Sequence, residues 1–332
     1  MKKIILALMC LLLIFTMLAG CENNEEKLRE FTLNEVTRSV FYTPLYVAAS
    51  KGFFEENGLK IEIVTGGGSD KSMTALLAGD AEIALMGPET GVYVINEGKE
   101  DHPVIIGQLT KRDGSFLISR VDEKDTFTWE SLEGKTIIGG RRGGMPFMTL
   151  EYILKKHGLT PGVDVTVLDN IQFNLIAGAF EGGTGDYVPL FEPTASMLVK
   201  EGKGYIVSQI GLESGEIPYT TFMVTQKMIK DDPQFIEAFL RSIYAAQKWV
   251  VTATDNEIAT AVQPFFPDTS IEILEAVAKS YREADCWMQN PIMTEDSFNR
   301  LLDVIETAGE LKSRVDFTDL VDNSFAQKIV GE

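Results

Sequence analysis

The chain has 332 residues, of which 45% are hydrophobic and 24% are charged, and its formal net charge is −19. These proportions are those of a globular protein, and the length predicts about two domains. The acidic excess argues against a nucleic-acid partner, because binding nucleic acid requires a basic surface that neutralises phosphates.

The first segment, residues 1–20, has the pattern of a secretory signal peptide. Two lysines precede an apolar run from Ile4 to Leu18, which is shorter than the roughly 20 residues that a membrane span needs. The run ends in Leu-Ala-Gly-Cys, which resembles the lipobox of bacterial lipoproteins and predicts lipidation at Cys21. The alternative is an uncleaved anchor helix. Residues 21–30 are polar and predict a disordered tether.

From Phe31 onwards, strand-like and helix-like segments alternate. Thr43 is expected to cap a helix that begins with proline. Later, the glycine loop "GGG" precedes Ser69 and Asp70, which are expected to cap the next helix. The nearly all-apolar "AEIALMG" is typical of a buried strand in a parallel sheet. This βαβ series predicts an α/β fold with a mainly parallel sheet.

A second series begins with "KTIIGG" and a helix over Met145–His157, with Phe147, Leu150 and Leu154 on its apolar face. The loop Gly139–Gly144 between them has the glycine spacing of a phosphate loop. However, Met-Pro stands where that motif requires Lys and Ser/Thr. We interpret the loop as a flexible basic segment at a helix N-terminus, able to bind anions or polar groups without catalysis. The alternative is an ordinary turn.

The two series carry similar loops. "GDAEIALMGPET" and "GDYVPLFEPT" each join a strand to a proline, a threonine and a glutamate. Both loops lie at the carboxyl end of a strand, where open α/β sheets bind ligands. Pro189 in the second strand predicts a bulge or a sheet edge, because proline removes a ladder hydrogen bond. From Asp231 to the C-terminus the pattern is helical.

An ordered set of segments resembles the periplasmic-type solute-binding proteins of ABC importers. The resemblance is to the branch that binds aliphatic sulfonates, nitrate, taurine and thiamine-pyrimidine precursors. The segments are FYTPLYVAASKGFFEENGLKIEIV, ALLAGDAEIALMG, LEGKTIIGG, GDYVPLFEPTASMLVKEG and PYTTFMVTQKMIKDDPQFIEAFLRSIYAA. The resemblance implies the type II fold: two α/β lobes joined by two crossing strands, SFLISR and TTFMVTQ. Lobe one is expected to comprise residues 31–115 and 226–332, including the helical C-terminal part, and lobe two residues 116–225.

The same resemblance implies an extracytoplasmic lipoprotein, anchored by lipid to the outer face of the bacterial cell membrane. It would deliver a small solute to the permease transmembrane subunits of an ABC importer. We expect a monomer that has no cofactor and no metal and is not an enzyme. A ligand-sensing lipoprotein is one alternative, and an enzyme related to thiamine-pyrimidine synthesis is another. Against the enzyme, the chain lacks the clustered histidines and cysteines that would bind iron, and it has no H-E-x-x-H, C-x-x-C or G-x-S-x-G motif.

The expected ligand site gathers loop residues of both series. They are Tyr42, Thr43, Ser69, Asp70, Pro88, Glu89 and Thr90 in lobe one, and Arg141, Arg142, Glu192 and Tyr219 in lobe two. Each has a structural alternative as a helix cap, a turn residue, a solvated arginine or a core aromatic residue. A sulfonate or nitrate site needs donors and little negative charge. Glu89 and Glu192 therefore favour an aminopyrimidine-like heterocycle, although both kinds of ligand stay open.

The lipobox predicts that Cys21→Ala releases the protein from membranes, because the variant has no thiol to carry a lipid. Stable anchoring takes roughly two lipid chains, so mass spectrometry of the wild-type N-terminal peptide should show both. Membrane and soluble fractions separated by ultracentrifugation provide the test. If the variant stays with the membranes, the uncleaved anchor helix is the correct interpretation.

Overall fold

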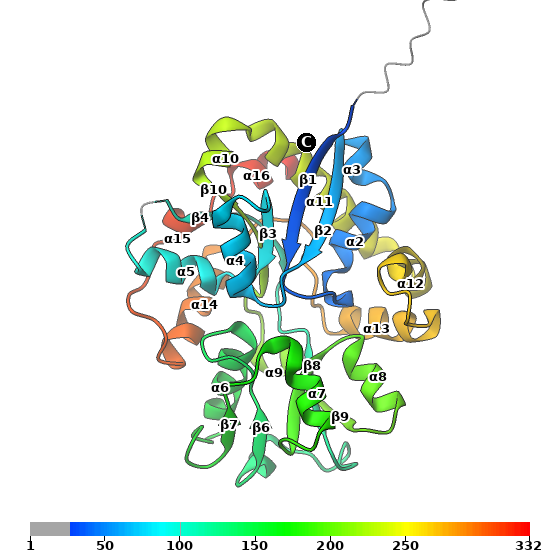
Figure 1. Ribbon diagram of the computed structural model, residues 1–332, viewed down its shortest axis with the longest axis vertical. Helices are drawn as coiled ribbons and strands as arrows, with labels where there is room; N and C mark the ends of the chain where they lie inside the picture. Colours follow the sequence, from blue (N-terminus) through cyan, green and yellow to red (C-terminus); the bar gives the residue numbers. More distant parts are fainter. Residues whose placement is uncertain (1–26, 100) are drawn as a thin grey trace, which may run out of the picture.

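The computed structural model describes residues 27–99 and 101–332, so the signal peptide, Cys21 and most of the tether lie outside the described residues. Two five-stranded sheets, each flanked by helices, form two lobes that lie one above the other in Figure 1. In each sheet one strand runs antiparallel to the other four. The predicted two-lobed α/β fold is therefore confirmed. Within the described residues, no helix is both long enough and apolar enough to cross a membrane.

The first sheet has the strand order β2-β1-β3-β10-β4, with β10 as its antiparallel strand. Its strands are β1 (Arg29–Glu35), β2 (Leu59–Thr65), β3 (Ile83–Met86), β4 (Pro103–Thr110) and β10 (Thr220–Thr225). The connections between the first four strands contain η1 (Val40–Tyr42), α2 (Thr43–Ser50), α3 (Phe53–Glu56), α4 (Ser69–Ala78) and α5 (Glu89–Asn96).

The C-terminal part is helical, as the sequence predicts. The long helix α11 (Pro233–Thr252) begins where the Asp232 side chain accepts a hydrogen bond from the Phe235 N–H, and it packs against α2 and α3. Its buried face includes Phe239 and Ile243. The other helices of this part are α10 (Gln226–Asp231), α12 (Asp255–Val262), η4 (Gln263–Phe265), α13 (Ile271–Glu283), α14 (Glu295–Thr307), α15 (Phe317–Leu320) and α16 (Ser324–Val330).

The second sheet has the order β7-β6-β8-β5-β9, with β5 as its antiparallel strand. Its strands are β5 (Ser115–Ser119), β6 (Thr136–Ile138), β7 (Thr166–Leu168), β8 (Tyr187–Phe191) and β9 (Tyr205–Gln209). Its helices are η2 (Trp129–Leu132), α6 (Met145–Lys156), η3 (Phe173–Leu175), α7 (Ile176–Glu181), α8 (Thr194–Lys200) and α9 (Ile210–Ser214). The predicted apolar face of α6 is buried through Phe147, Leu150 and Leu154.

Pro189 lies in a central strand, so the prediction of a bulge or an edge at this residue is wrong. It pairs with Leu117 of β5 in regular antiparallel register. On its other side, β8 pairs with β6 only at Ile137↔Tyr187, and β6 ends at Ile138. Proline is tolerated here because the ladder with β6 has already ended, so the missing N–H removes no ladder hydrogen bond.

The chain passes between the two sheets at residues 111–114 and again at residues 215–219. The two crossings lie side by side, because the Ile217 N–H donates to the Lys111 carbonyl at 2.9 Å and the Tyr219 N–H to the Thr110 carbonyl at 3.2 Å. The expected crossing strands instead form β5 and β10, one in each sheet. Residues 220–225, which the predicted boundary assigned to lobe two, complete the first sheet because buried β10 fills the place between β3 and β4.

Two glycines allow close packing at the crossings. A Cβ atom on Gly114 would lie 2.3 Å from the Phe41 ring, and one on Gly211 would lie 2.0 Å from the backbone oxygen of Asp113. Helix α9 therefore lies directly against the first crossing, and η1 lies against the same segment from the other lobe. A larger residue at Gly211 would require a backbone shift, and one at Gly114 would require the Phe41 ring to move.

We expect Gly211→Ala to lower the free energy of unfolding by about 1–3 kcal/mol, the usual effect of overpacking a tight contact. Gly178→Ala in α7 is the matched control, because nothing lies within 4 Å of its added Cβ. In that helix the change should stabilise by roughly 0.5–1 kcal/mol. Urea unfolding of both variants measures the difference. Equal urea midpoints for the two variants would show that α9 is not closely packed against the first crossing.

Candidate ligand-binding cleft

A cleft with about 730 Å³ of free space, part of it open to solvent, lies between the two lobes. Lobe one lines it with residues that follow β1, β2 and β3: Val36, Thr37, Tyr42, Gly67, Gly68, Ser69, Asp70 and Gly87. The cleft thus lies at the carboxyl ends of the strands, where parallel sheets bind ligands.

Lobe two contributes the glycine loop after β6 and the first turn of α6. Gly140 and Gly143 have φ angles of +89° and +75°, which favour glycine. Gly144 is the N-cap of α6 and has no side chain with which to cap it, and Pro146 lies in the first turn. The first N–H groups of α6 therefore remain available beside the cleft, which Met145 and Pro146 line.

The two adjacent arginines of this loop have different surroundings. Arg141 lines the cleft, and its Nε lies 3.7 Å from Asp70 Oδ1 of lobe one. The Arg142 side chain turns away and donates from Nε to Asp169 Oδ2 at 2.8 Å. Its guanidinium also lies over the Phe147 ring. Only Arg141 of the pair faces the cleft, and neither arginine is paired with Glu192 in the structure.

Glu89 is fully buried, and neither carboxyl oxygen has a hydrogen-bond partner among the described residues. A Cβ atom on Gly87 would lie 2.0 Å from Glu89 Oε2, so the carboxyl group occupies the space next to the cleft wall that Gly87 leaves free. Burial raises the pKa of Glu89 from 4.5 to about 7, and the backbone N–H groups of Glu89 and Met145 and the positive charge of Arg141 offset this shift only in part. An incompletely compensated acceptor therefore lies at the base of the cleft.

Aromatic residues and a second buried carboxyl group lie near the crossings. Tyr219 and Phe191 line the cleft with ring centroids 6.0 Å apart, and Phe173 lies 5.8 Å from Phe191. Asp113 Oδ1 accepts hydrogen bonds from Ser115, and burial raises the pKa of Asp113 to about 6. The Tyr219 hydroxyl has no hydrogen bond of normal geometry within the described chain. A flat ligand could stack here and reach polar groups at its edge.

Several expected site residues do not line the cleft, because local bonds already satisfy them. The Thr43 hydroxyl donates to the Val40 carbonyl and the Thr90 hydroxyl to the Gly87 carbonyl, both at 2.7 Å. The Glu192 carboxyl accepts from the N–H and hydroxyl of Ser196 at 2.9 and 2.8 Å, in the first turn of α8. Pro88 is the N-cap residue of α5. Thr43, Thr90 and Glu192 therefore form local turn and helix-cap hydrogen bonds, which were the structural alternatives to a role in ligand binding.

Two helix starts also differ from expectation. The N-cap residue of α2 is Tyr42 rather than Thr43, and that of α4 is Gly68 rather than Ser69. Ser69 Oγ instead accepts a hydrogen bond from the Gly87 N–H at 3.4 Å, which joins two cleft loops. Released from capping, the Ser69 and Asp70 side chains line the cleft.

The sequence prediction missed cleft residues that follow strand ends directly. Val36 and Thr37 follow β1, and Gln172 and Phe173 follow β7. The rule that ligands bind beyond the carboxyl ends of parallel strands would have found them, had it been applied to every strand. They lack charge and lie outside the repeated loops, so composition alone gave no signal.

Polar contacts bring the lobes together on both sides of the cleft. The Tyr93 hydroxyl of lobe one donates to the Gly143 carbonyl of lobe two at 2.8 Å. On the other side, the Ser39 hydroxyl donates to the Glu192 carbonyl at 2.6 Å. The structure therefore represents a closed arrangement, in which groups at the base of the cleft are shielded from water.

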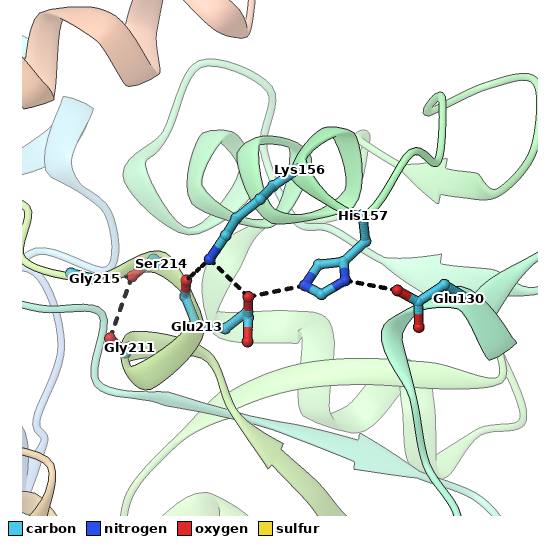
Figure 2. Close-up of polar contacts among 7 residues, drawn as sticks. All are labelled: Glu130, Lys156, His157, Gly211, Glu213, Ser214 and Gly215. Atoms are coloured by element: carbon cyan, nitrogen blue, oxygen red, sulfur yellow. Dashed lines mark hydrogen bonds and ion pairs between the residues drawn. The ribbon is translucent and has the colours of Figure 1, made fainter.

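The C-terminal end of α6 is fixed to α9 and η2, away from the cleft (Figure 2). Lys156 Nζ and His157 Nε2 both contact Glu213 Oε1 at 2.8 Å, and His157 Nδ1 lies 2.9 Å from Glu130 Oε1. Partial burial alone would lower the pKa of His157, but hydrogen bonds to Glu130 and Glu213 outweigh burial and raise that pKa. Because α9 lies against the first crossing, α6 connects the cleft to residues 111–114.

The fold is that of the periplasmic binding proteins. Among solved structures, the alkanesulfonate-binding protein SsuA from Xanthomonas axonopodis pv. citri bound to MOPS has a TM-score of 0.71 and 16% identity, covering 89% of this chain and 98% of that one. The nitrate-binding protein NrtA from Synechocystis PCC 6803 has a TM-score of 0.73 and 16% identity, covering 92% and 89%. The chain belongs to the NMT1/THI5-like family, whose model matches residues 40–256.

Two curated relatives are similar to the chain in sequence. It is 42% identical to the Bacillus subtilis (strain 168) protein YtlA, which is provisionally named as a binding protein, over 95% of this chain and 94% of the relative. It is 25% identical to the 4-amino-5-hydroxymethyl-2-methylpyrimidine phosphate synthase of Aspergillus parasiticus, over 64% of this chain and 63% of the relative. In the part of the chain that the structure describes, no three His, Cys, Asp or Glu residues form a group that could hold a metal ion.

The raised pKa of Glu89 predicts a specific loss of stability with rising pH. The folded protein holds this proton to higher pH than the unfolded chain, so the contribution is fully present below about pH 4.5 and is lost as pH rises through about 7. Glu89→Gln should therefore be more stable than the wild type above pH 7, by on the order of 3 kcal/mol.

Urea unfolding of both proteins between pH 5 and pH 8 measures this difference. Subtracting the two curves removes the contribution of His157, which also titrates in this range but is unchanged in the variant. Parallel curves would mean that Glu89 finds a partner in solution that the structure does not contain.

Proposed function

We propose that the chain is the extracytoplasmic solute-binding lipoprotein of an ABC importer, which captures a small solute between its lobes and delivers it to the permease. The observation that carries this proposal is the closed cleft, lined by loops from both lobes around unsatisfied polar groups. The 42% identity to a relative named as a binding protein supports it. The lipobox at Cys21 supports lipid attachment at the outer face of the cell membrane, with the protein acting as a monomer.

The cleft chemistry supports binding without turnover. The described residues that line the cleft include neither histidine nor cysteine, so no Ser–His or Cys–His pair lies there. Arg141 and Asp70 come from opposite lobes, and Tyr42 lies opposite the start of α6 in the lining. Groups that meet only when the lobes are together suit a binder that closes over its ligand.

The alternative of an enzyme related to pyrimidine synthesis rests on the synthase relative, which matches less of the chain at lower identity. The two functions differ in the fate of the ligand. A binder returns it chemically intact, whereas a synthase converts it. Mass spectrometry of ligand recovered after prolonged incubation with the protein separates them, and stoichiometric conversion would exclude the binding function.

The first test of the binding function is a thermal-shift screen of the mature protein. The panel holds alkanesulfonates, nitrate, taurine and aminopyrimidines. A ligand present at 100 times its Kd should stabilise the folded protein by about 2.7 kcal/mol. If no member of the panel raises the melting temperature, the proposed range of solutes is wrong.

For a ligand found in this way, Arg141→Ala and Tyr42→Ala should each weaken binding by about 1–3 kcal/mol, because each removes a cleft group from a different lobe. Arg142→Ala is the matched control, since its side chain binds Asp169 outside the cleft. Isothermal titration calorimetry measures the three affinities. If Arg142→Ala weakens binding as much as Arg141→Ala, the loop as a whole, and not the cleft contact, determines affinity.

A further inference from the structure

The carboxyl group of Glu89 is buried beside the cleft, and the neighbouring groups do not fully neutralise its negative charge when it is ionised. The side chain is completely enclosed, it begins helix α5, and neither of its oxygens has a hydrogen bond of normal geometry within the described residues, although the backbone N–H groups of Glu89 and Met145 lie near it. A buried ionised carboxylate without a donor is strongly disfavoured. In the closed, ligand-free arrangement this group must therefore hold a proton, or the lobes must open.

The groups that face Glu89 come from both lobes and do not neutralise it. They are Arg141 from the loop before α6, Asp70 from α4, Tyr42 from η1, Tyr93 from α5 itself and Tyr219 beside the second crossing. Arg141 is the cation of this set, and it also faces the competing carboxylate of Asp70 at 3.7 Å. The tyrosine hydroxyls stay protonated, because burial and the nearby carboxyl groups raise their pKa values.

Glu89 lies directly behind the cleft wall, and its buried carboxyl oxygens are not themselves part of the lining in the closed arrangement. Its carboxyl group lies beside Gly87, which lines the cleft. The groups that act on it include Arg141, Asp70 and the Met145 N–H, all of which belong to cleft-lining residues. A ligand seated between the lobes would thus bring its own atoms next to the incompletely compensated acceptor.

We propose that Glu89 is a specificity-determining residue: it selects ligands that bring an N–H donor, above all a cationic one, to the base of the closed cleft. A ligand without such a donor can close the lobes only together with a proton on Glu89. This inference rests on the proposed function and names its ligand class, an amine or amino-heterocycle rather than a simple anion. Binding of the selected class releases the Glu89 proton, because a donor stabilises the ionised form.

Two pairs of probes test the inference, and the members of each pair differ by one amino group. Taurine is compared with ethanesulfonate, and 4-amino-5-hydroxymethyl-2-methylpyrimidine with 5-hydroxymethyl-2-methylpyrimidine. Calorimetry measures each affinity at pH 5.5, 6.5 and 8 for the wild type, Glu89→Gln and Glu151→Gln. Glu151 provides the matched control, because its carboxyl is also largely buried with a raised pKa but does not line the cleft.

We expect the amino member of the pair that binds to be at least about tenfold tighter at pH 8. Below pH 7 its affinity should rise by up to about tenfold per pH unit, with release of about one proton, since ionised Glu89 is the binding form. Glu89→Gln should remove both the amino preference and the pH dependence, and Glu151→Gln should keep them. Proton release is read from the heat of binding in two buffers of different ionisation enthalpy.

If the probe without the amino group binds equally well at pH 8, or if Glu89→Gln keeps the preference, the inference is overturned while the binding function stands. If neither pair binds, the proposed range of solutes is wrong. The role of Glu89 is then tested by the stability of the ligand-free protein as a function of pH. A difference in stability between the wild type and Glu89→Gln that stays constant with pH would then overturn the inference. A difference that grows as pH rises from 5 to 7 would support it.

Discussion

Close packing at the two crossings is the constraint on which the cleft depends. The chain links its two sheets through residues 111–114 and 215–219, and these segments hydrogen-bond to each other. Gly114 gives room for the Phe41 ring and Gly211 for the backbone of Asp113. Backbone atoms of α9 contact the backbone of the first crossing, and the first crossing contacts the Phe41 ring. These close contacts limit the ways in which the lobes can approach each other. The cleft loops are therefore brought together in a defined arrangement rather than in many.

That defined arrangement brings acidic groups together. The cleft contains Asp70, Glu89 lies beside its wall, and Asp113 is buried at the crossing behind Tyr219. Arg141 supplies one positive charge against them. Folding tolerates this because burial favours protonated carboxyl groups, as the raised pKa values of Glu89 and Asp113 indicate. Such a site keeps unsatisfied polar groups ready for a partner that the chain itself does not contain, and this distinguishes it from a closed apolar core.

Much of the fold could be predicted from local sequence. Strand and helix periodicity gave the two α/β series, and the Asp-Pro start gave α11. Contacts between distant segments could not be predicted. Pro189 is central because β6 ends early, and β10 joins the first sheet because a gap remains between β3 and β4. In the cleft, Ser69, Asp70, Arg141 and Tyr219 line the site, whereas Glu192 and Arg142 find nearer partners. Sequence places such residues in the right loops, but side-chain direction is decided by neighbours from other elements.

The fixed ends of α6 have a mechanical consequence. Its first turn lies on the cleft, and its last residues are tied to α9 and η2 through Lys156 and His157. A helix of 12 residues is a stiff rod about 18 Å long. A displacement of its first turn would therefore reach the segment beside the first crossing. The same helix contacts α14 of lobe one, where Lys155 Nζ donates to the Thr307 carbonyl, so separating the lobes requires breaking this contact as well as bending the chain at residues 111–114 and 215–219.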